Sequence, residues 1–357
     1  MKPLRPTPLF WLLPLALAAV MSGCAASDGG PRTRLGSLPF PGIFSLYEAA
    51  DPGNLGVHCS GSPLLRLGHR GEQPRGTLYT RRAGFIDLSH LRETIDWVSF
   101  FHTRNLHALS QVEMDGPATA VYSFSYCLAK FEVTFTPPKW WNAAPLEERQ
   151  QIIEELAIRS AQRLSVVTTT WHEAATWLGY QTVPGISEAG SAFTWDDGTA
   201  HIVGAIVGGR ALRDIGTQWD EAVTRELDDE LLELDVVSRE EFRDAALIVR
   251  ERWWKQGVAV RRDFDVGLED GHKVPWLVPE FGTDAAMLML PTFENVCGRD
   301  LTGAMELRIT PARWVMRRLM DETDPAESLE GEAGLLKAVE LVREQMRAKF
   351  GEGFDQP

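Results

Sequence analysis

The chain has 357 residues and a formal net charge of −14, and 44% of its residues are hydrophobic. So acidic a protein is poorly suited to bind nucleic acid or anionic lipid headgroups, and we expect no nucleic-acid partner. Its length and hydrophobic content are sufficient for a full core, in one large domain or two smaller ones.

The start of the chain has the pattern of a bacterial lipoprotein signal. Lys2 and Arg5 give a positive N-terminal region, an apolar run follows, and the small residues Ser22 and Gly23 precede Cys24. We therefore expect cleavage before Cys24 and lipid attachment to its thiol. The alternatives are an ordinary secretory signal or an uncleaved anchor, in which Cys24 has no special role.

The pattern divides the chain into three parts. We expect a signal peptide over residues 1–23, a flexible tether over residues 24–41 and a single globular domain over residues 42–357, which ends in a C-terminal helix. No later apolar run approaches the ~18 residues that span a bilayer, so the lipid is the expected membrane attachment. This predicts a bacterial envelope protein, anchored at the outer membrane and facing the periplasm.

Cysteine usage leaves the disulfide state open. Cys59, Cys127 and Cys297 follow the leader, and none of them has a spacing typical of metal ligands. An envelope location permits a disulfide, but the odd count leaves at least one thiol over. The simpler interpretation is that these cysteine side chains are buried and unpaired. The chain also contains 12 tryptophans, for which packing is favoured over sugar binding.

Short strands are predicted first in the body of the chain. Residues 76–80, 84–86 and 119–126 are β-branched or aromatic and are bounded by glycine, proline or charged residues. A helix is predicted directly after the second segment, with Asp87 as its N-cap. The predicted buried stripe of this helix contains Leu91, Thr94, Val98 and Phe101.

Helices dominate the middle of the chain. Residues 145–178 predict a long helix that begins with proline and two acidic residues. Another helix is predicted to begin at Thr194, which forms a variant capping box with Asp197. Two amphipathic helices, each charged on one face, are predicted over about 220–234 and 238–256.

The last third is predicted to be more irregular. Residues 258–300, rich in glycine, proline and aspartate, predict loops with short strands, and residues 321–332 predict an acidic hinge. A final helix follows, with Leu335, Val339, Val342 and Met346 as its apolar stripe. Gly204 and Gly208, one turn apart, predict close packing of the helix that follows Thr194. Together these segments predict an α+β fold: a helix-dominated single domain with a few short N-terminal strands.

The end of the 145–178 helix is the segment richest in candidate chemistry. His172 and Glu173 lie there among threonines and tryptophans, and buried polar groups without partners cost about 1–3 kcal/mol each. The zinc motif H-E-x-x-H is similar, but Thr176 stands at its second histidine. A metal would need ligands from elsewhere. Alternatively, the pair bridges neighbouring elements and has a structural role.

A second candidate group lies at the start of the helix capped by Asp87. His90 is in its first turn, where the helix dipole disfavours an imidazolium, so we expect a neutral His90 that can act as metal ligand or general base. Arg92 follows it and can serve as an anion clamp. The alternative is a histidine that hydrogen-bonds a backbone carbonyl.

A third group surrounds the next helix start. Glu188 lies on the loop after the His172 helix, where the returning chain can bring its carboxylate back toward that pair. Asp196 and Asp197 follow, and His201 lies one turn beyond Asp197, so the two can share a ligand or simply pair. Helix capping explains the two aspartates equally well.

Taken together, these segments resemble the uncharacterised bacterial lipoprotein family named domain of unknown function 4056. The resemblance is carried by GFIDLSHLR at 84–92, WHEAATWLG at 171–179 and SAFTWDD at 191–197. The family pattern continues with Tyr-Ser-Asn, whereas this chain has Thr-Ala-His, so the resemblance assigns no role to His201. It implies a lipoprotein of the same kind and no established activity.

Two functions are compatible with these groups. The first is a hydrolase with a polar pocket, in which Glu173 is the general base, His90 and His172 are metal ligands or acid/base partners, and Arg92 is the anion clamp. A divalent metal would be held by His90, His172, Glu188 and Asp196, and the substrate would be an envelope peptide, glycan or lipid. The alternative is a non-catalytic lipoprotein that binds or scaffolds an envelope partner. Nucleotide-binding loops and the G-x-S-x-G elbow are absent from the sequence.

Overall fold

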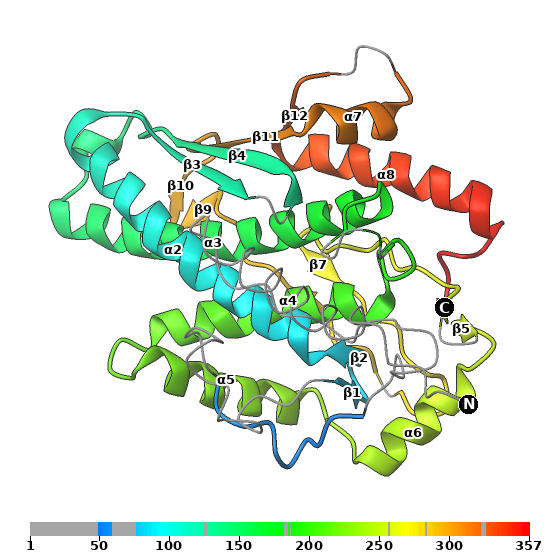
Figure 1. The fold of residues 1–357 in the computed structure, drawn as a ribbon. Helices are drawn as coiled ribbons and strands as arrows, with labels where there is room; N and C mark the ends of the chain where they lie inside the picture. Colours follow the sequence, from blue (N-terminus) through cyan, green and yellow to red (C-terminus); the bar gives the residue numbers. More distant parts are fainter. Residues whose placement is uncertain are drawn as a thin grey trace, which may run out of the picture.

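Two long helices, α2 (Leu88–Asp115) and α3 (Leu146–Trp177), pack against each other at the centre of the protein (Figure 1). The computed structural model describes residues 49–58, 76–124, 127–181, 185, 187–255, 258–282, 284–322 and 326–357, except for the side chains of residues 113–115. Both helices begin where the sequence predicts: Asp87 caps α2, and Pro145 lies directly before α3.

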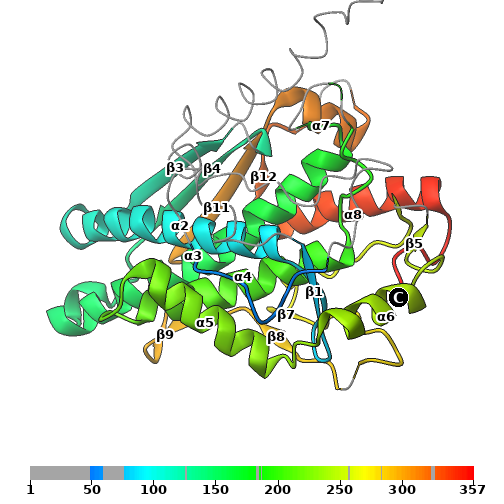
Figure 2. The same ribbon diagram turned by 60° about the horizontal axis from the view of Figure 1, so that its bottom comes forward.

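A four-stranded antiparallel sheet lies on one side of these helices (Figures 1 and 2). Its order is β12-β11-β4-β3, with bounds β3 (Ala118–Phe124), β4 (Ala129–Phe135), β11 (Met305–Pro311) and β12 (Leu329–Glu330). Side chains of β4 alternate between buried and half-buried, as expected for a strand with one face on the core. Helix α8 (Gly331–Phe350) contacts both β11 and α3.

Helix α4 (Trp195–Arg213) packs on α2 and α3, away from the sheet, and α5 (Trp219–Glu233) covers α4 (Figure 1). The hairpin of β1 (Thr77–Thr80) and β2 (Gly84–Asp87) contacts α4 and continues without a break into α2. The first turn of α2 is therefore held beside α4.

Glycines allow α4 to approach α2 closely, as the sequence predicts. A Cβ atom at Gly204 would lie 2.5 Å from the carbonyl oxygen of Leu91, and one at Gly208 would lie 3.0 Å from Cβ of Val98. Backbone atoms cannot move aside as flexible side chains can. Gly204 therefore fixes the spacing between the two helices.

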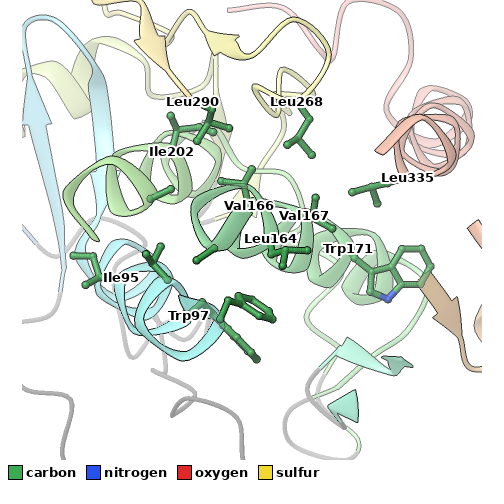
Figure 3. Packing of buried hydrophobic residues seen from close by; sticks show 14 of the residues in the cluster. Ile95, Trp97, Leu164, Val166, Val167, Trp171, Ile202, Leu268, Leu290 and Leu335 are labelled. Carbon is green, nitrogen blue, oxygen red and sulfur yellow. The ribbon is translucent and has the colours of Figure 1, made fainter. Parts of the chain in front are cut away.

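The main core includes residues from Ala50 to Phe354. Figure 3 shows Ile95 of α2, Leu164 of α3 and Ile202 of α4 in one packed region. Trp171 is fully buried there, and its indole N–H donates to the Cys127 carbonyl at 2.7 Å. Five of the 11 tryptophans that the structure describes are buried and five more are partly buried against a hydrophobic cluster, which agrees with the packing interpretation.

A second, aromatic cluster lies where the β1–β2 hairpin meets the start of α4. The ring centroid of Trp253 lies 5.4 Å from that of Trp195 and 5.6 Å from that of Trp276. Phe85 of β2 packs against the same indole at 6.2 Å. This cluster anchors the first turn of α4 to the hairpin that precedes α2.

The helix predicted over 238–256 is shorter in the structure, and that prediction was wrong at its C-terminal end. Helix α6 (Arg239–Ile248) stops because Glu251 adopts a left-handed conformation with φ 63° and the chain turns to bring Trp253 into the aromatic cluster. Burial of an indole outweighs continuation of the helix.

Several elements were not predicted. The sequence pattern missed β4, β11 and α7 (Arg313–Met320), so most of the sheet is found only in the structure. The predicted short strands of 258–300 are present. Within this range β7 (His272–Lys273) pairs with β8 (Leu288–Met289), and β9 (Asn295–Val296) pairs with β10 (Arg299–Asp300). Strand β6 (Val258–Ala259) pairs with β5 (Trp254–Lys255), which lies where the sequence predicts the end of a helix. A short 3₁₀ helix, η3 (Trp141–Ala143), precedes α3. The fold is α+β and dominated by helices.

Several sequence predictions fall on residues that the structure does not describe. The predicted signal peptide at 1–23, the tether at 24–41 and Cys59 lie outside the described residues. Cys127 and Cys297 are free thiols, and burial raises the pKa of the Cys127 thiol. No helix in the described ranges combines the length and apolar character needed to cross a membrane.

The close helix contact can be tested with Gly204→Ala. We expect the free energy of unfolding to fall by about 1–3 kcal/mol, because the added methyl group overlaps the Leu91 carbonyl. Urea denaturation measures the change. The control is Gly198→Ala in the same helix, where the new Cβ would meet only Lys273 at an ordinary 3.5 Å. Equal stability of the two variants would contradict the proposed constraint.

Candidate functional site

The first turn of α2 brings His90 against two carboxylates. The Asp87 Oδ1 atom accepts hydrogen bonds from the backbone N–H groups of Ser89 at 2.7 Å and His90 at 2.9 Å, which confirms the predicted N-cap. The Nδ1 atom of His90 lies 3.2 Å from Asp87 Oδ1 and 2.9 Å from Asp197 Oδ1. The contact to Asp197 joins α2 to α4.

Asp197 is held by the residue before α4. The hydroxyl of Thr194 donates to Asp197 Oδ2 at 2.7 Å, and Thr194 makes no side-chain cap to the helix backbone. The predicted capping box is therefore wrong, because its threonine hydroxyl serves as a donor to the carboxylate. One oxygen of Asp197 is fixed by Thr194, and the other faces His90.

Glu173 approaches the same place from α3. Its Oε2 atom accepts a hydrogen bond from the Phe193 N–H at 2.7 Å, and the residue is 6% exposed. Burial and the negative charge of Asp197 raise the pKa of Glu173 to about 8, although the charge of His90 opposes this shift. Burial and Asp197 likewise raise the pKa of Asp196 to about 8. Carboxylates from three elements therefore influence one another here.

Two further histidines lie behind His90. The His201 ring meets the His90 ring edge-on, with centroids 5.6 Å apart, and His201 is 4% exposed. Burial, and then the charges of His90, His172 and Lys273, hold the pKa of His201 well below its usual range. His172 is also buried and packs edge-on against Tyr180 at 5.1 Å. His201, to which the family resemblance assigns no role, is thus the histidine nearest the His90 ring.

The surroundings of His90 oppose the neutral state expected for it. Burial alone would lower the pKa of His90, but the carboxylates of Asp197 and Asp87 raise it well above its usual range. A helix N-terminus contributes about half a charge, spread over its first turn, whereas each carboxylate brings a full negative charge close to the ring. The sequence showed the helix start but not Asp197, which arrives from another helix.

A buried ion pair lies beneath the first turn of α4. Lys273, fully buried, donates from Nζ to Asp263 Oδ2 at 2.5 Å and to the Asp265 carbonyl at 2.6 Å. A Cβ atom at Gly198 would be 3.5 Å from this ammonium group. Sequence reasoning missed the pair because both residues belong to an irregular segment, where no periodic pattern distinguishes buried charges from exposed ones.

The predicted site residues do not all meet. The charges of His90 and Asp196 act on Glu173, and the charges of His90 and His172 act on His201. The predicted place of Arg92 beside His90 was wrong: it is buried, and its guanidinium donates to the Leu55 carbonyl at 2.7 Å. Residues two apart on a helix face different directions. Arg92 therefore joins α2 to the 49–58 segment.

The predicted metal ligands are rearranged in the same way. Among the described residues, the group whose ligand atoms all lie within 4.8 Å of one another is Asp87, His90 and Asp197. Glu188 is half-buried on the turn before α4, where its carbonyl accepts hydrogen bonds from Ser191. The sequence predicts Asp87 as a helix cap and Asp197 as a cap or a partner of His201, and only the meeting of two helix starts shows the proximity of the two aspartates.

The site is open to solvent mainly at one edge. The side chain of His90 is 22% exposed and Asp196 is half-buried, whereas Asp87, Glu173 and His201 are buried. Imidazole and carboxylate groups can exchange protons with a reacting molecule or coordinate a metal. Molecules from solvent would meet His90 first.

Fold and site together define a helix-rich α+β protein with a buried centre of histidines and carboxylates. Residues 16–269 match the family model described as "Protein of unknown function (DUF4056)", and the chain belongs to this family. The matched range includes Asp87, His90, Glu173, Asp197 and His201. Neither the curated proteins nor the solved structures contain a match to the chain.

The buried pair under α4 can be tested with Lys273→Met. We expect a loss of about 3–5 kcal/mol in the free energy of unfolding, because Asp263 stays buried without its partner. Adding Asp263→Leu should recover much of this loss. Denaturant titration measures all three proteins. The exposed pair of Arg308 and Glu330 gives the control, since Arg308→Met should cost less than about 1 kcal/mol. Similar losses for Lys273→Met and Arg308→Met would contradict the assignment.

Proposed function

We propose that this protein is a hydrolase of the bacterial cell envelope, with its reaction centre at Asp87, His90, Asp197 and Glu173. The observation that carries the proposal is the convergence of these side chains from the starts of α2 and α4 and from the end of α3. Hydrolysis needs groups that take a proton from water and return one to the leaving group. A scattered arrangement would have excluded this function.

Each residue has a role in this proposal. Glu173 is the general base. His90, the most exposed of the four side chains, contacts the substrate or its attacking water. Asp87 and Asp197 place negative charge beside the imidazole, because both contact the same ring nitrogen. Arg92 has no part in the reaction, since its guanidinium is bound to the Leu55 carbonyl.

The expected cellular location of the protein restricts the class of its substrate. A lipid on Cys24 would hold the domain at the outer membrane, facing the periplasm, where peptides, glycans and lipids of the envelope are within reach. The acidic body would add little to membrane attachment. An envelope component is therefore the substrate class that we propose.

Burial of the centre favours a second candidate function. Glu173 and His201 expose 6% and 4% of their surfaces, as side chains in a purely structural network would. In that case the protein is a non-catalytic lipoprotein that binds or scaffolds an envelope partner. The two candidates differ in what conservative substitutions do to hydrolysis.

The hydrolase proposal is tested with the purified full-length protein on peptidoglycan, phospholipids and envelope peptides. We expect hydrolysis of one of these classes, and we expect Glu173→Gln and His90→Gln each to lower its rate by about 100-fold or more, since each removes an acid/base group. The control is His272→Gln, which removes a histidine paired with Asp270 at 3.1 Å outside the site. Folding of each variant is checked by circular dichroism.

Two results would count against a hydrolase. One is the absence of hydrolysis of all three classes by the unmodified protein. The other is a measured rate that Glu173→Gln and His90→Gln leave unchanged. If Glu173→Gln changes only the thermal stability, the structural network and the scaffold function are supported.

Lipid attachment is tested by metabolic labelling with palmitate in a bacterial host. We expect the label to enter the unmodified protein and to be lost in Cys24→Ser, with release from the membrane fraction, because the thiol is the predicted acylation site. Cys297→Ser, which removes an exposed free thiol, is the matched control and should keep the label. Labelling that persists in Cys24→Ser would contradict the predicted anchor.

A further inference from the structure

The contacts of His90 with its two carboxylates lack the geometry of hydrogen bonds. Nδ1 lies 2.9 Å from Asp197 Oδ1 and 3.2 Å from Asp87 Oδ1, yet it forms no hydrogen bond with any residue in the described ranges. Hydrogen bonds require the acceptor to lie near the direction of the donor hydrogen. The nitrogen and the two oxygens thus form a compact triangle, and neither oxygen lies in line with the N–H.

These separations match the distances between neighbouring ligand atoms around one metal ion. Two ligands about 2.0–2.1 Å from one ion, at tetrahedral or octahedral angles, lie roughly 2.8–3.4 Å apart. The ligand atoms of Asp87, His90 and Asp197 all lie within 4.8 Å of one another. To hold one ion, the three side chains would turn until every separation falls into the range of neighbouring ligands.

His201 gives a second, independent observation. It is 96% buried, and no hydrogen bond or ion pair to its ring forms within the described part of the chain. Its ring centroid lies 5.6 Å from that of His90, close to the roughly 5–5.5 Å expected for two imidazoles on one ion with metal–nitrogen distances of about 2.0–2.1 Å.

The local charges also favour a cation. No lysine or arginine of the described ranges forms an ion pair with Asp196, Asp197 or Glu173. The nearest buried cation, Lys273, is bound to Asp263. Buried carboxylates need compensation by positive charge, which a divalent ion would supply at the centre of the group.

We propose that Asp87, His90 and Asp197 bind a divalent first-row transition metal of the Zn²⁺ type, and that His201, whose nitrogens lie outside this 4.8 Å group, moves in as the fourth ligand. Two imidazoles with two carboxylates suit such an ion better than Mg²⁺ or Ca²⁺, which prefer oxygen ligands alone. Hydrogen bonds from the α2 backbone to Asp87 and from Thr194 to Asp197 hold these ligands in place. The inference builds on the proposed function by naming the cofactor of the same site.

The test measures metal binding directly, without substrate. The full-length protein is stripped with a chelator and titrated with Zn²⁺ by calorimetry. We expect one ion per chain, and we expect His90→Gln, Asp197→Asn and His201→Gln each to weaken binding at least tenfold. His272→Gln should bind as the unmodified protein does, although it also removes a histidine that contacts an aspartate. Excess Mg²⁺ or Ca²⁺ should not displace the ion.

A second measurement covers variants that fail to fold. Co²⁺ added to the stripped, unmodified protein should give the strong visible absorption of a four-coordinate site, and Zn²⁺ should abolish it. Absence of stoichiometric Zn²⁺ and Co²⁺ binding would overturn the proposal, as would unchanged affinity in folded His90→Gln and Asp197→Asn. Unchanged Zn²⁺ affinity in His201→Gln alone would contradict the assignment of His201 as the fourth ligand.

The outcome separates this inference from the hydrolase proposal. Stoichiometric Zn²⁺ binding without hydrolysis of any envelope substrate would support the metal site and count against the hydrolase. Hydrolysis by a chelator-stripped protein that binds no metal would support the hydrolase and overturn the metal site.

Discussion

The close approach of α4 to α2 at Gly204 is the constraint on which the candidate site depends. Leu91, whose carbonyl would lie 2.5 Å from a side chain at that position, directly follows His90 in the chain. The spacing that avoids this overlap also brings Asp197 and His201, on the first two turns of α4, to the His90 ring. Backbone packing, rather than attraction between the charged groups, therefore sets the geometry of the site.

That geometry gathers several charged side chains in the protein interior, where few charges are normally tolerated. Helix starts favour carboxylates, and Asp87 and Asp197 both lie at such starts. Both side chains are buried. A cationic imidazole or a bound metal ion each offsets part of the resulting negative charge. The proposed hydrolysis and the proposed metal binding thus rest on one arrangement of carboxylates around His90.

Local patterns in the sequence were sufficient to predict several parts of this arrangement. The N-cap at Asp87, the position of His90 in the first turn and the close packing at Gly204 all follow from preferences that act within a few residues. Other features depend on residues far apart in the chain. The end of α6 is set by burial of Trp253 in an aromatic cluster, and β11 pairs with β4 across more than a hundred residues.

Sequence patterns were enough to predict the α+β class, the central helices, the family and the segments that carry the candidate chemistry. Which of those side chains meet depends on the packing of the helices, which brings Asp197 and His201 to His90 and directs Arg92 to the 49–58 segment. The two kinds of feature differ in the distance along the chain over which their interactions act. Caps, turns and helix periodicity are local, whereas the charge on His90 depends on Asp197, more than a hundred residues away in the chain.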